Sequence, residues 1–224
     1  MKRSQINALI ENTIAWLGEM RVYLPPFAYW TAEEWASKGH EYDEIRENML
    51  GWDITDYGRG DFDKVGLLLF TIRNGNLNNP NYAKPYAEKM LISEVGQLSP
   101  NHFHWHKMED IINRGGGTLM MQLWNSALDG ELDYTEVTVR IDGKKCTLPA
   151  GGKVFLKPGE SITLGPGVYH QFTAVDEKVL AWEVSMVNDD RTDNRFYEHQ
   201  ARFTAIEEDE PARYLLCNEY PKCV

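Results

Sequence analysis

Cysteine is scarce in this sequence, and the three residues present, Cys146, Cys217 and Cys223, form no Cys-x-x-Cys pair. Their odd number and wide spacing support neither a disulfide framework nor a zinc ribbon, and they fit a reducing, cytoplasmic environment. No run of about eighteen apolar residues occurs, so we expect no membrane span. Lys2 and Arg3 are not followed by an apolar signal core, and we expect this segment to stay in the mature protein.

Basic residues are also few. The chain has 23 Lys and Arg residues against 34 Asp and Glu residues, a formal net charge of -11. Nucleic-acid binding normally needs a basic patch that neutralises phosphates, so the sequence argues against a nucleic-acid partner and leaves small polar substrates open. With 7 Trp, 11 Tyr and 42% hydrophobic residues in 224, we expect one ordered domain with a proper core.

The first 63 residues read as a helical extension. Apolar residues at three- and four-residue steps predict an amphipathic helix over residues 4–20: Ile6, Leu9, Ile10, Ile14 and Leu17. Thr31 and Glu34 form a capping-box pattern, which predicts a short helix that ends near residue 37. A third helix is expected over residues 42–49, followed by a turn-rich, acidic segment at 51–63.

From about residue 64 to residue 187 the sequence changes to short apolar runs separated by Gly, Pro, Asn or Asp. The expected strands cover residues 65–72, 89–93, 101–105, 119–123, 135–141, 153–156, 161–164, 170–174 and 178–185. Many short strands at this spacing predict a mainly β protein built on a jelly-roll barrel. The acidic and aromatic residues 188–224 are expected to wrap back over that barrel.

Three of the six histidines, His102, His104 and His106, lie in or beside one predicted strand, and Glu109 follows them. Residues two apart in a strand point the same way, so His102 and His104 share a face, and His106 joins them if the strand extends to it. His170 follows a Gly-Pro-Gly turn further on. Imidazoles and a carboxylate on a rigid barrel suit a divalent first-row metal. A hydrogen-bonded or exposed histidine pair is the alternative.

The spacing of these residues resembles the two motifs of the cupin superfamily, whose β-barrels hold one metal between three histidines and a glutamate. The first motif matches at every position from Gly96 to Gly116. The second departs twice, with Gly165 where the family often has proline and Ala174 where it often has asparagine. By this resemblance the metal ligands are His102, His104, Glu109 and His170.

The sequence as a whole is similar to the bacterial D-lyxose isomerase family. The segments that carry the resemblance are residues 24–30, 51–64, 84–89, 102–117, 188–197 and 206–211. The resemblance implies aldose–ketose isomerisation of a small free sugar, D-lyxose to D-xylulose, with D-mannose to D-fructose as a second reaction. A divalent metal would stabilise the enediolate as a Lewis acid. The resemblance favours Mn2+ over Fe2+, Co2+, Ni2+ and Zn2+.

Moving a proton between C1 and C2 also requires a general base. Glu183 is the first candidate, because strand alternation makes it the one acid on an otherwise small, inward-compatible face. A structural glutamate, salt-bridged at the barrel rim, is the alternative. Lys107, beside the histidine motif, would polarise a substrate oxygen or protonate the enediolate, unless it is a solvated surface lysine.

Further residues are candidates for contacts to the sugar. Lys89, Asp190 and Arg191 would hold hydroxyls further down the chain, although the run 189–195 equally fits a self-satisfied charged loop. A ligand set of His104, His106 and Glu109 would leave only two residues before the carboxylate, too few for the strand and turn of a cupin motif. His106 is therefore expected to contact substrate or to support the ligands. The acidic residues 207–210 fit a solvated turn, with a lid as the alternative.

Two other functions are compatible with the same sequence. A non-catalytic cupin would bind or sense sugars, and an iron oxygenase would use the same kind of ligands. The amino-terminal helix and the proline-rich segment after it lead us to expect a homodimer.

Overall fold

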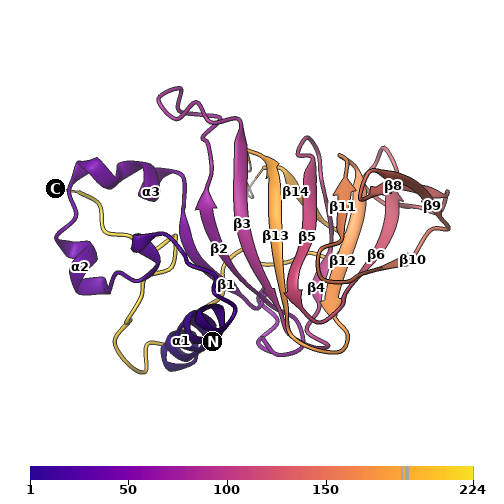
Figure 1. The fold of residues 1–224 in the computed structure, drawn as a ribbon. Helices are drawn as coiled ribbons and strands as arrows, with labels where there is room; N and C mark the ends of the chain where they lie inside the picture. The colour runs from indigo at the N-terminus through magenta and orange to yellow at the C-terminus, as the bar shows by residue number, and fades with distance from the viewer. Residues whose placement is uncertain (188, 190–191, 224) are drawn as a thin grey trace.

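The computed structural model describes residues 1–187, 189 and 192–223. Figure 1 shows the helices gathered at one end of the molecule and the strands curling away from them. The helices are α1 (Arg3–Glu19), α2 (Ala32–Ala36) and α3 (Asp43–Glu47), with the 3-10 turns η1 (Pro26–Ala28) and η2 (His40–Tyr42). Within the described ranges, no helix combines the length and the apolar character that crossing a membrane requires.

The three helices begin where the sequence predicts them. The capping box of α2 is present, since the Glu34 amide donates to Thr31 Oγ1 at 3.2 Å and the Thr31 amide donates to Glu34 Oε2 at 2.8 Å. Helix α3 is shorter than expected and ends at Glu47. Met49 has a φ of 52°, a left-handed conformation that cannot continue a helix.

The strands form two antiparallel sheets. The larger has the strand order β1-β2-β3-β13-β5-β11-β8-β9, and the smaller has the order β10-β6-β12-β4-β14, with β7 beside β6. The strands are β1 (Gly51–Thr55), β2 (Leu67–Arg73), β3 (Tyr86–Ser93), β4 (Ser99–His104), β5 (Glu109–Gly116), β6 (Leu119–Ser126), β7 (Leu132–Asp133), β8 (Val137–Ile141), β9 (Lys144–Leu148), β10 (Gly152–Leu156), β11 (Ser161–Leu164), β12 (Val168–Ala174), β13 (Val179–Met186) and β14 (Asn194–Phe196).

The predicted mainly β, cupin-type barrel is confirmed, but five strands are missing from the prediction: β1, β5, β7, β9 and β14. Strand β1 lies in the segment expected to be turn-rich. The sequence suggests turns there because Gly and Asp are poor strand formers. All five residues of β1 are nevertheless buried. Burial between neighbouring elements has therefore outweighed local propensity there.

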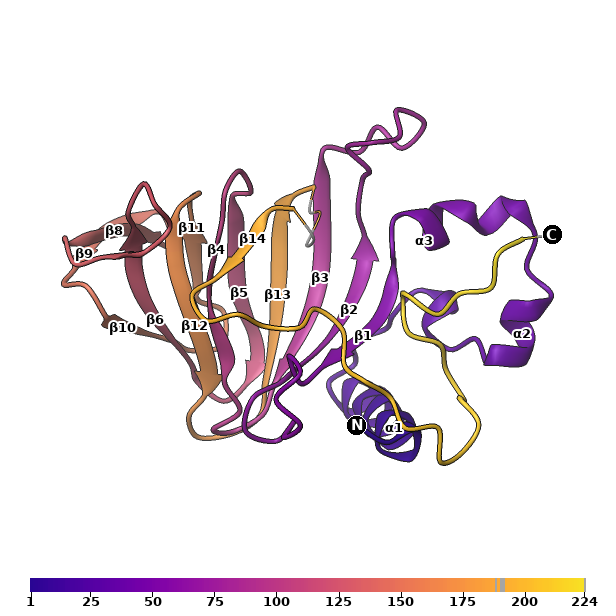
Figure 2. The ribbon, with the colours of Figure 1, turned by 180° about the vertical axis from the view of Figure 1, so that it is seen from behind.

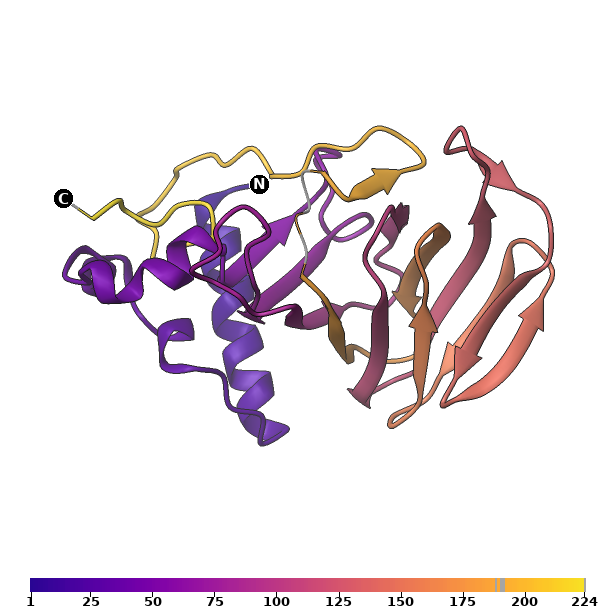
Figure 3. The ribbon, with the colours of Figure 1, turned by 90° about the horizontal axis from the view of Figure 1, so that it is seen from above.

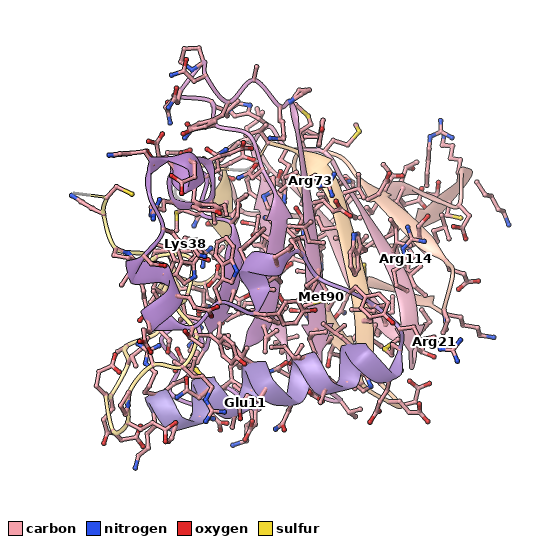
Figure 4. All side chains as sticks on the ribbon, turned by 60° about the vertical axis from the view of Figure 1, so that its left-hand side comes forward. Glu11, Arg21, Lys38, Arg73, Met90 and Arg114 are labelled. Atoms are coloured by element: carbon pink, nitrogen blue, oxygen red, sulfur yellow. The ribbon has the colours of Figure 1, made fainter. Side chains whose placement is uncertain are left out.

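Strand β2 reads as a continuous apolar run because both of its faces are covered. Leu67 and Leu69 belong to the core inside the barrel, whereas Leu68 and Phe70 belong to a second core on the outer face. The apolar stripe of α1 packs into that second core together with Met90 of β3. Figure 4 shows α1 crossing the strands of this sheet, with Met90 labelled close to it. Helix α1 therefore supports the sheet from outside and leaves the barrel interior open for a site.

The carboxyl-terminal segment runs back from β14 to the helical end of the molecule (Figures 2 and 3). The Cys217 amide donates to the Trp52 carbonyl at 2.7 Å. Arg3, which is buried, donates from Nε to Glu208 Oε2 at 2.9 Å and from Nη1 to Glu219 Oε2 at 3.1 Å. The acidic turn around residue 208 is therefore bound to α1, not merely solvated.

Candidate functional site

Three histidines meet inside the barrel. His102 of β4 pairs directly with His170 of β12, and His104 lies two residues further along β4. Opposed residues and residues two apart share a face, so strand pairing brings all three rings together. The ring centroids of His102 and His170 lie 4.2 Å apart, and those of His102 and His104 lie 5.2 Å apart. One nitrogen of each ring lies within 4.8 Å of the other two.

Two of these rings are held in the tautomer that a metal ligand needs. Nδ1 of His102 lies 2.8 Å from the Pro100 carbonyl oxygen, and Nδ1 of His170 lies 3.0 Å from the Val168 carbonyl oxygen. A carbonyl oxygen only accepts, so each Nδ1 carries the proton and each Nε2 presents a lone pair. Burial, reinforced by His170 and His104, holds the pKa of His102 well below 6.5. The ring is therefore neutral and able to bind a cation.

Glu109, at the start of β5 in the opposite sheet, adds a carboxylate to these acceptors. Its Oε1 lies 3.1 Å from His170 Nε2 and 3.4 Å from His104 Nε2. Among the described residues, neither ring nitrogen of His104 nor Oε1 of Glu109 has a hydrogen-bond partner. Buried lone pairs that converge without a donor are costly unless a cation lies among them. The donor set of three imidazoles and one carboxylate therefore fits a divalent metal.

The second oxygen of Glu109 belongs to a buried network of charges. Lys107 Nζ lies 2.7 Å from Glu109 Oε2 and 2.8 Å from Glu183 Oε1. Lys89 Nζ lies 3.4 Å from the same oxygen of Glu183, and Ser185 Oγ donates to it at 2.8 Å. Lys107 is 3% exposed, so the alternative of a solvated surface lysine is wrong. The alternative for Glu183 is a structural glutamate, salt-bridged at the barrel rim. Glu183 does form salt bridges, but it is 5% exposed and lies inside the barrel, not at its rim.

The pKa values in this network follow from the opposing charges. Burial alone would lower the pKa of Lys107, but Glu109 and Glu183 outweigh it and raise that pKa above 10.5. Burial would likewise raise the pKa of each glutamate, and Lys107 outweighs it in both. The pKa of Glu109 is held well below 4.5, and the pKa of Glu183 is lowered from 4.5 with help from Lys89. At neutral pH Glu183 is therefore a carboxylate, the form that can accept a proton.

A cavity, called the histidine cavity below, opens beside these groups between the two sheets. Its polar lining consists of Thr55, Tyr57, Lys89, Ser99, His102, His104, Lys107, Glu109, His170, Glu183, Asn194 and Arg202. The sequence analysis did not single out Tyr57, Asn194 or Arg202. Tyr57 and Asn194 lie in segments that carry the family resemblance, which was the one signal for them, and Arg202 lies outside those segments.

The remaining predicted site residues lie elsewhere. Strand β4 ends at His104, so strand alternation stops before His106, whose side chain is exposed outside the histidine cavity. Asp193 holds the chain there, since its carboxylate accepts from the backbone amides of His106 at 2.8 Å and Lys107 at 3.1 Å. This turn directs Lys107 inward. Asp190 and Arg191 lie outside the described residues.

We expect Lys107→Met to destabilise the metal-free protein by about 3–5 kcal/mol, because it leaves Glu109 and Glu183 buried with less opposing charge. Urea unfolding at pH 7 measures this change in free energy. The pKa values of both glutamates are depressed in the folded state, so the stability they contribute is present above 4.5 and is lost as the pH falls through the folded values. The difference in the free energy of unfolding between the unmodified protein and Lys107→Met should therefore become smaller in acid.

Lys64→Met is the matched control for this prediction. Lys64 pairs with Asp61 at 2.7 Å on the surface, where solvent screens the two charges and such a bridge contributes little to stability. Equal effects of the two substitutions would show that the buried network contributes nothing beyond an ordinary surface pair.

The fold and the site together define a cupin-type β-barrel with a candidate metal centre between its sheets. Within that class, the profile of the family described as D-lyxose isomerase matches residues 1–220. The chain belongs to the D-lyxose isomerase family, and the family and enzyme class predicted from the sequence are confirmed.

Two curated relatives, each called D-lyxose/D-mannose isomerase, come from Serratia proteamaculans and Escherichia coli O157:H7. Each is 45% identical over 223 residues, covering 98% of this chain and 98% of the relative. The L-ribose isomerase of Acinetobacter sp. DL28, solved with L-ribose, has a TM-score of 0.63 at 15% identity over 92% of this chain and 98% of its own. The L-ribose isomerase of Geodermatophilus obscurus has a TM-score of 0.60 at 14% identity over the same shares. These two structures share the fold.

Proposed function

We propose that this protein is an aldose–ketose isomerase that interconverts D-lyxose and D-xylulose and, as a second reaction, D-mannose and D-fructose. Family membership and the names of both curated relatives support the choice of sugars. The observation that carries the proposal is the position of an ionised carboxylate, Glu183, next to a converging set of buried acceptors that fits a metal. An isomerase of this kind needs both a base and an electrophile in one cavity.

In the proposed site His102, His104, Glu109 and His170 would hold the cation, which would act as a Lewis acid and stabilise the negative charge that develops on the sugar oxygens. Glu183 removes the proton from C2 of the aldose, and the electron pair shifts into a C1–C2 double bond and onto the C1 oxygen, which gives an enediolate. Glu183 then returns the proton to C1, while the C2 hydroxyl passes its proton to the C1 oxygen, so that C2 becomes the ketone and C1 carries a hydroxyl. Lys107 and Lys89, both beside Glu183, donate hydrogen bonds to sugar oxygens.

The donor set of three imidazoles and a carboxylate accommodates several first-row ions. We propose Mn2+ as the resident ion, because the family resemblance favours it. Asp190 and Arg191 stay predicted substrate contacts. His106 is left out of the proposed contacts, because its side chain lies outside the histidine cavity. The homodimer and the cytoplasmic location likewise stay predictions.

The direct test is an assay of the purified protein, stripped of metal and reloaded with Mn2+, on D-lyxose. We expect D-xylulose to accumulate to an equilibrium mixture, and D-mannose to give D-fructose. Saturable binding of either sugar without turnover would instead support a sugar-binding cupin. Oxygen consumption during the assay would support an oxygenase.

A further inference from the structure

A second hollow, called the distal hollow below, adjoins the histidine cavity on the side of the helical extension. Its lining includes Asn48, Asp53, Thr71, Asn74, Lys89 and Arg202. These side chains come from the turn after α3, from β1, β2 and β3, from the loop after β2 and from the carboxyl-terminal segment. Five of the six are buried although all six are polar. The wall of this space is therefore polar, which suits a polar ligand better than an apolar one.

The distal hollow and the histidine cavity share part of their walls. Lys89 and Arg202 line both spaces. Strand register places Thr71 of β2 directly opposite Lys89 of β3, and Lys89 directly opposite Glu183 of β13. Opposed residues share a face, so a polar row runs from Glu183 into the distal hollow. Two strand spacings, about 10 Å in all, separate the backbones of Thr71 and Glu183.

Hydrogen-bonding groups of both kinds face this space. Asn48, which is 4% exposed, donates from Nδ2 to the Asn74 carbonyl oxygen at 3.1 Å. Its Oδ1 is a buried acceptor without a hydrogen-bond partner in the described part of the chain. Thr71 supplies a hydroxyl that can donate or accept. An unpaired buried acceptor on one lining residue and a hydroxyl on another match the hydroxyl groups of a sugar.

The charges of the distal hollow are already balanced within the protein. Arg202 Nη2 lies 2.5 Å from Asp53 Oδ2, and Lys89 faces Glu183. A phosphate would require cations that no carboxylate neutralises. The lining therefore favours a neutral, hydroxyl-bearing group over a phosphorylated one.

We propose that the distal hollow receives the far end of a six-carbon sugar whose C1 and C2 react beside Glu183, and that Thr71 and Asn48 bind the hydroxyls there. This inference rests on the proposed isomerase function. D-mannose is D-lyxose lengthened by one hydroxyl-bearing carbon at the end remote from C1. Contacts in the distal hollow therefore act on the hexose more than on the pentose, and the helical extension takes part in sugar specificity.

The test is Thr71→Val, which removes the hydroxyl and nearly conserves the shape of the side chain. We expect kcat/KM for D-mannose to fall about fivefold, the effect of one net hydrogen bond, and kcat/KM for D-lyxose to change less than twofold. Thr138→Val, at an exposed position of β8 outside both spaces, is the matched control and should change neither value. Equal changes for the two sugars, or no change for D-mannose, would overturn the inference.

Calorimetric binding of both sugars to the Mn2+-loaded proteins separates this inference from the proposed function. If the unmodified protein binds D-mannose without turning it over, the isomerase proposal fails. The inference still stands if Thr71→Val then weakens the binding of D-mannose selectively. If the unmodified protein binds neither sugar, or if the substitution leaves the affinity for D-mannose unchanged, the distal hollow is not a sugar site. An unchanged melting temperature shows that the variant is folded.

Discussion

Glu183→Gln should lower kcat for D-lyxose about a thousandfold while the protein keeps its metal. A positioned general base contributes about 10²–10⁴-fold to such a proton transfer, and glutamine cannot accept the proton. Glu183 lies outside the converging acceptors, whose carboxylate is Glu109, so metal content should not change. Steady-state kinetics with metal analysis of the same sample measures both. A variant that retains a tenth or more of the activity would exclude Glu183 as the base.

Glu88→Gln is the matched control for Glu183→Gln, and it should leave kcat for D-lyxose unchanged. Glu88 lies opposite Val184 in the same pair of strands, on the other face of the sheet, where its Oε1 accepts from Trp182 Nε1 at 2.7 Å. Isomerisation by the unmodified protein in deuterated water adds a second measurement. Substantial deuterium at C1 of D-xylulose requires proton transfer and excludes a pure hydride shift. Absence of deuterium would leave only a shielded base or a hydride shift.

His102→Ala should abolish turnover and weaken the binding of Mn2+ by more than about 100-fold, because it removes one of the proposed ligands. Metal analysis after dialysis and activity with added Mn2+ measure the two effects. Thermal unfolding adds a third. At a metal concentration of 1,000 times Kd, a bound ion stabilises the folded state by about 4 kcal/mol, and this stabilisation should disappear in the variant.

His106→Ala tests whether the metal ligands of the histidine motif include His106 or only His102 and His104. His106 stands in the same short segment but is exposed outside the histidine cavity, so the variant should keep its metal and its metal-dependent stabilisation. Loss of metal from His106→Ala and retention by His102→Ala would exchange the roles that we propose for these two residues.

The convergence of His102, His104, Glu109 and His170 could be predicted from the sequence because most of its parts are local. His102 and His104 are two residues apart in one strand, and this period alone fixes their common face. Glu109 follows within a few residues, and His170 is identified by its own glycine-rich motif. The long, strongly periodic α1 and the doubly covered β2 were predictable for the same reason.

The rest of the cavity could not be predicted, because its residues depend on contacts between distant segments. Strand β1 is fixed by pairing with β2 and by burial, not by its own propensity. Arg202 reaches the cavity through its ion pair with Asp53, 149 positions away. The inward direction of Lys107 depends on Asp193, whose carboxylate accepts from the backbone amides of His106 and Lys107. This turn ends the alternation of β4, which the sequence pattern alone would have extended to His106. No local pattern encodes such pairings.

The ion pairs between Arg3 and the carboxyl-terminal segment have a consequence for the order of folding. Arg3 and Glu219 stand 216 positions apart, so the loop that joins them contains almost the whole chain. Closing so long a loop is entropically unfavourable and is typical of slow steps in folding. During synthesis, α1 emerges from the ribosome long before residues 208 and 219 exist. A nascent chain therefore carries the Arg3 guanidinium without its carboxylates, and the helical layer can be completed only after residues 208 and 219 have been synthesised.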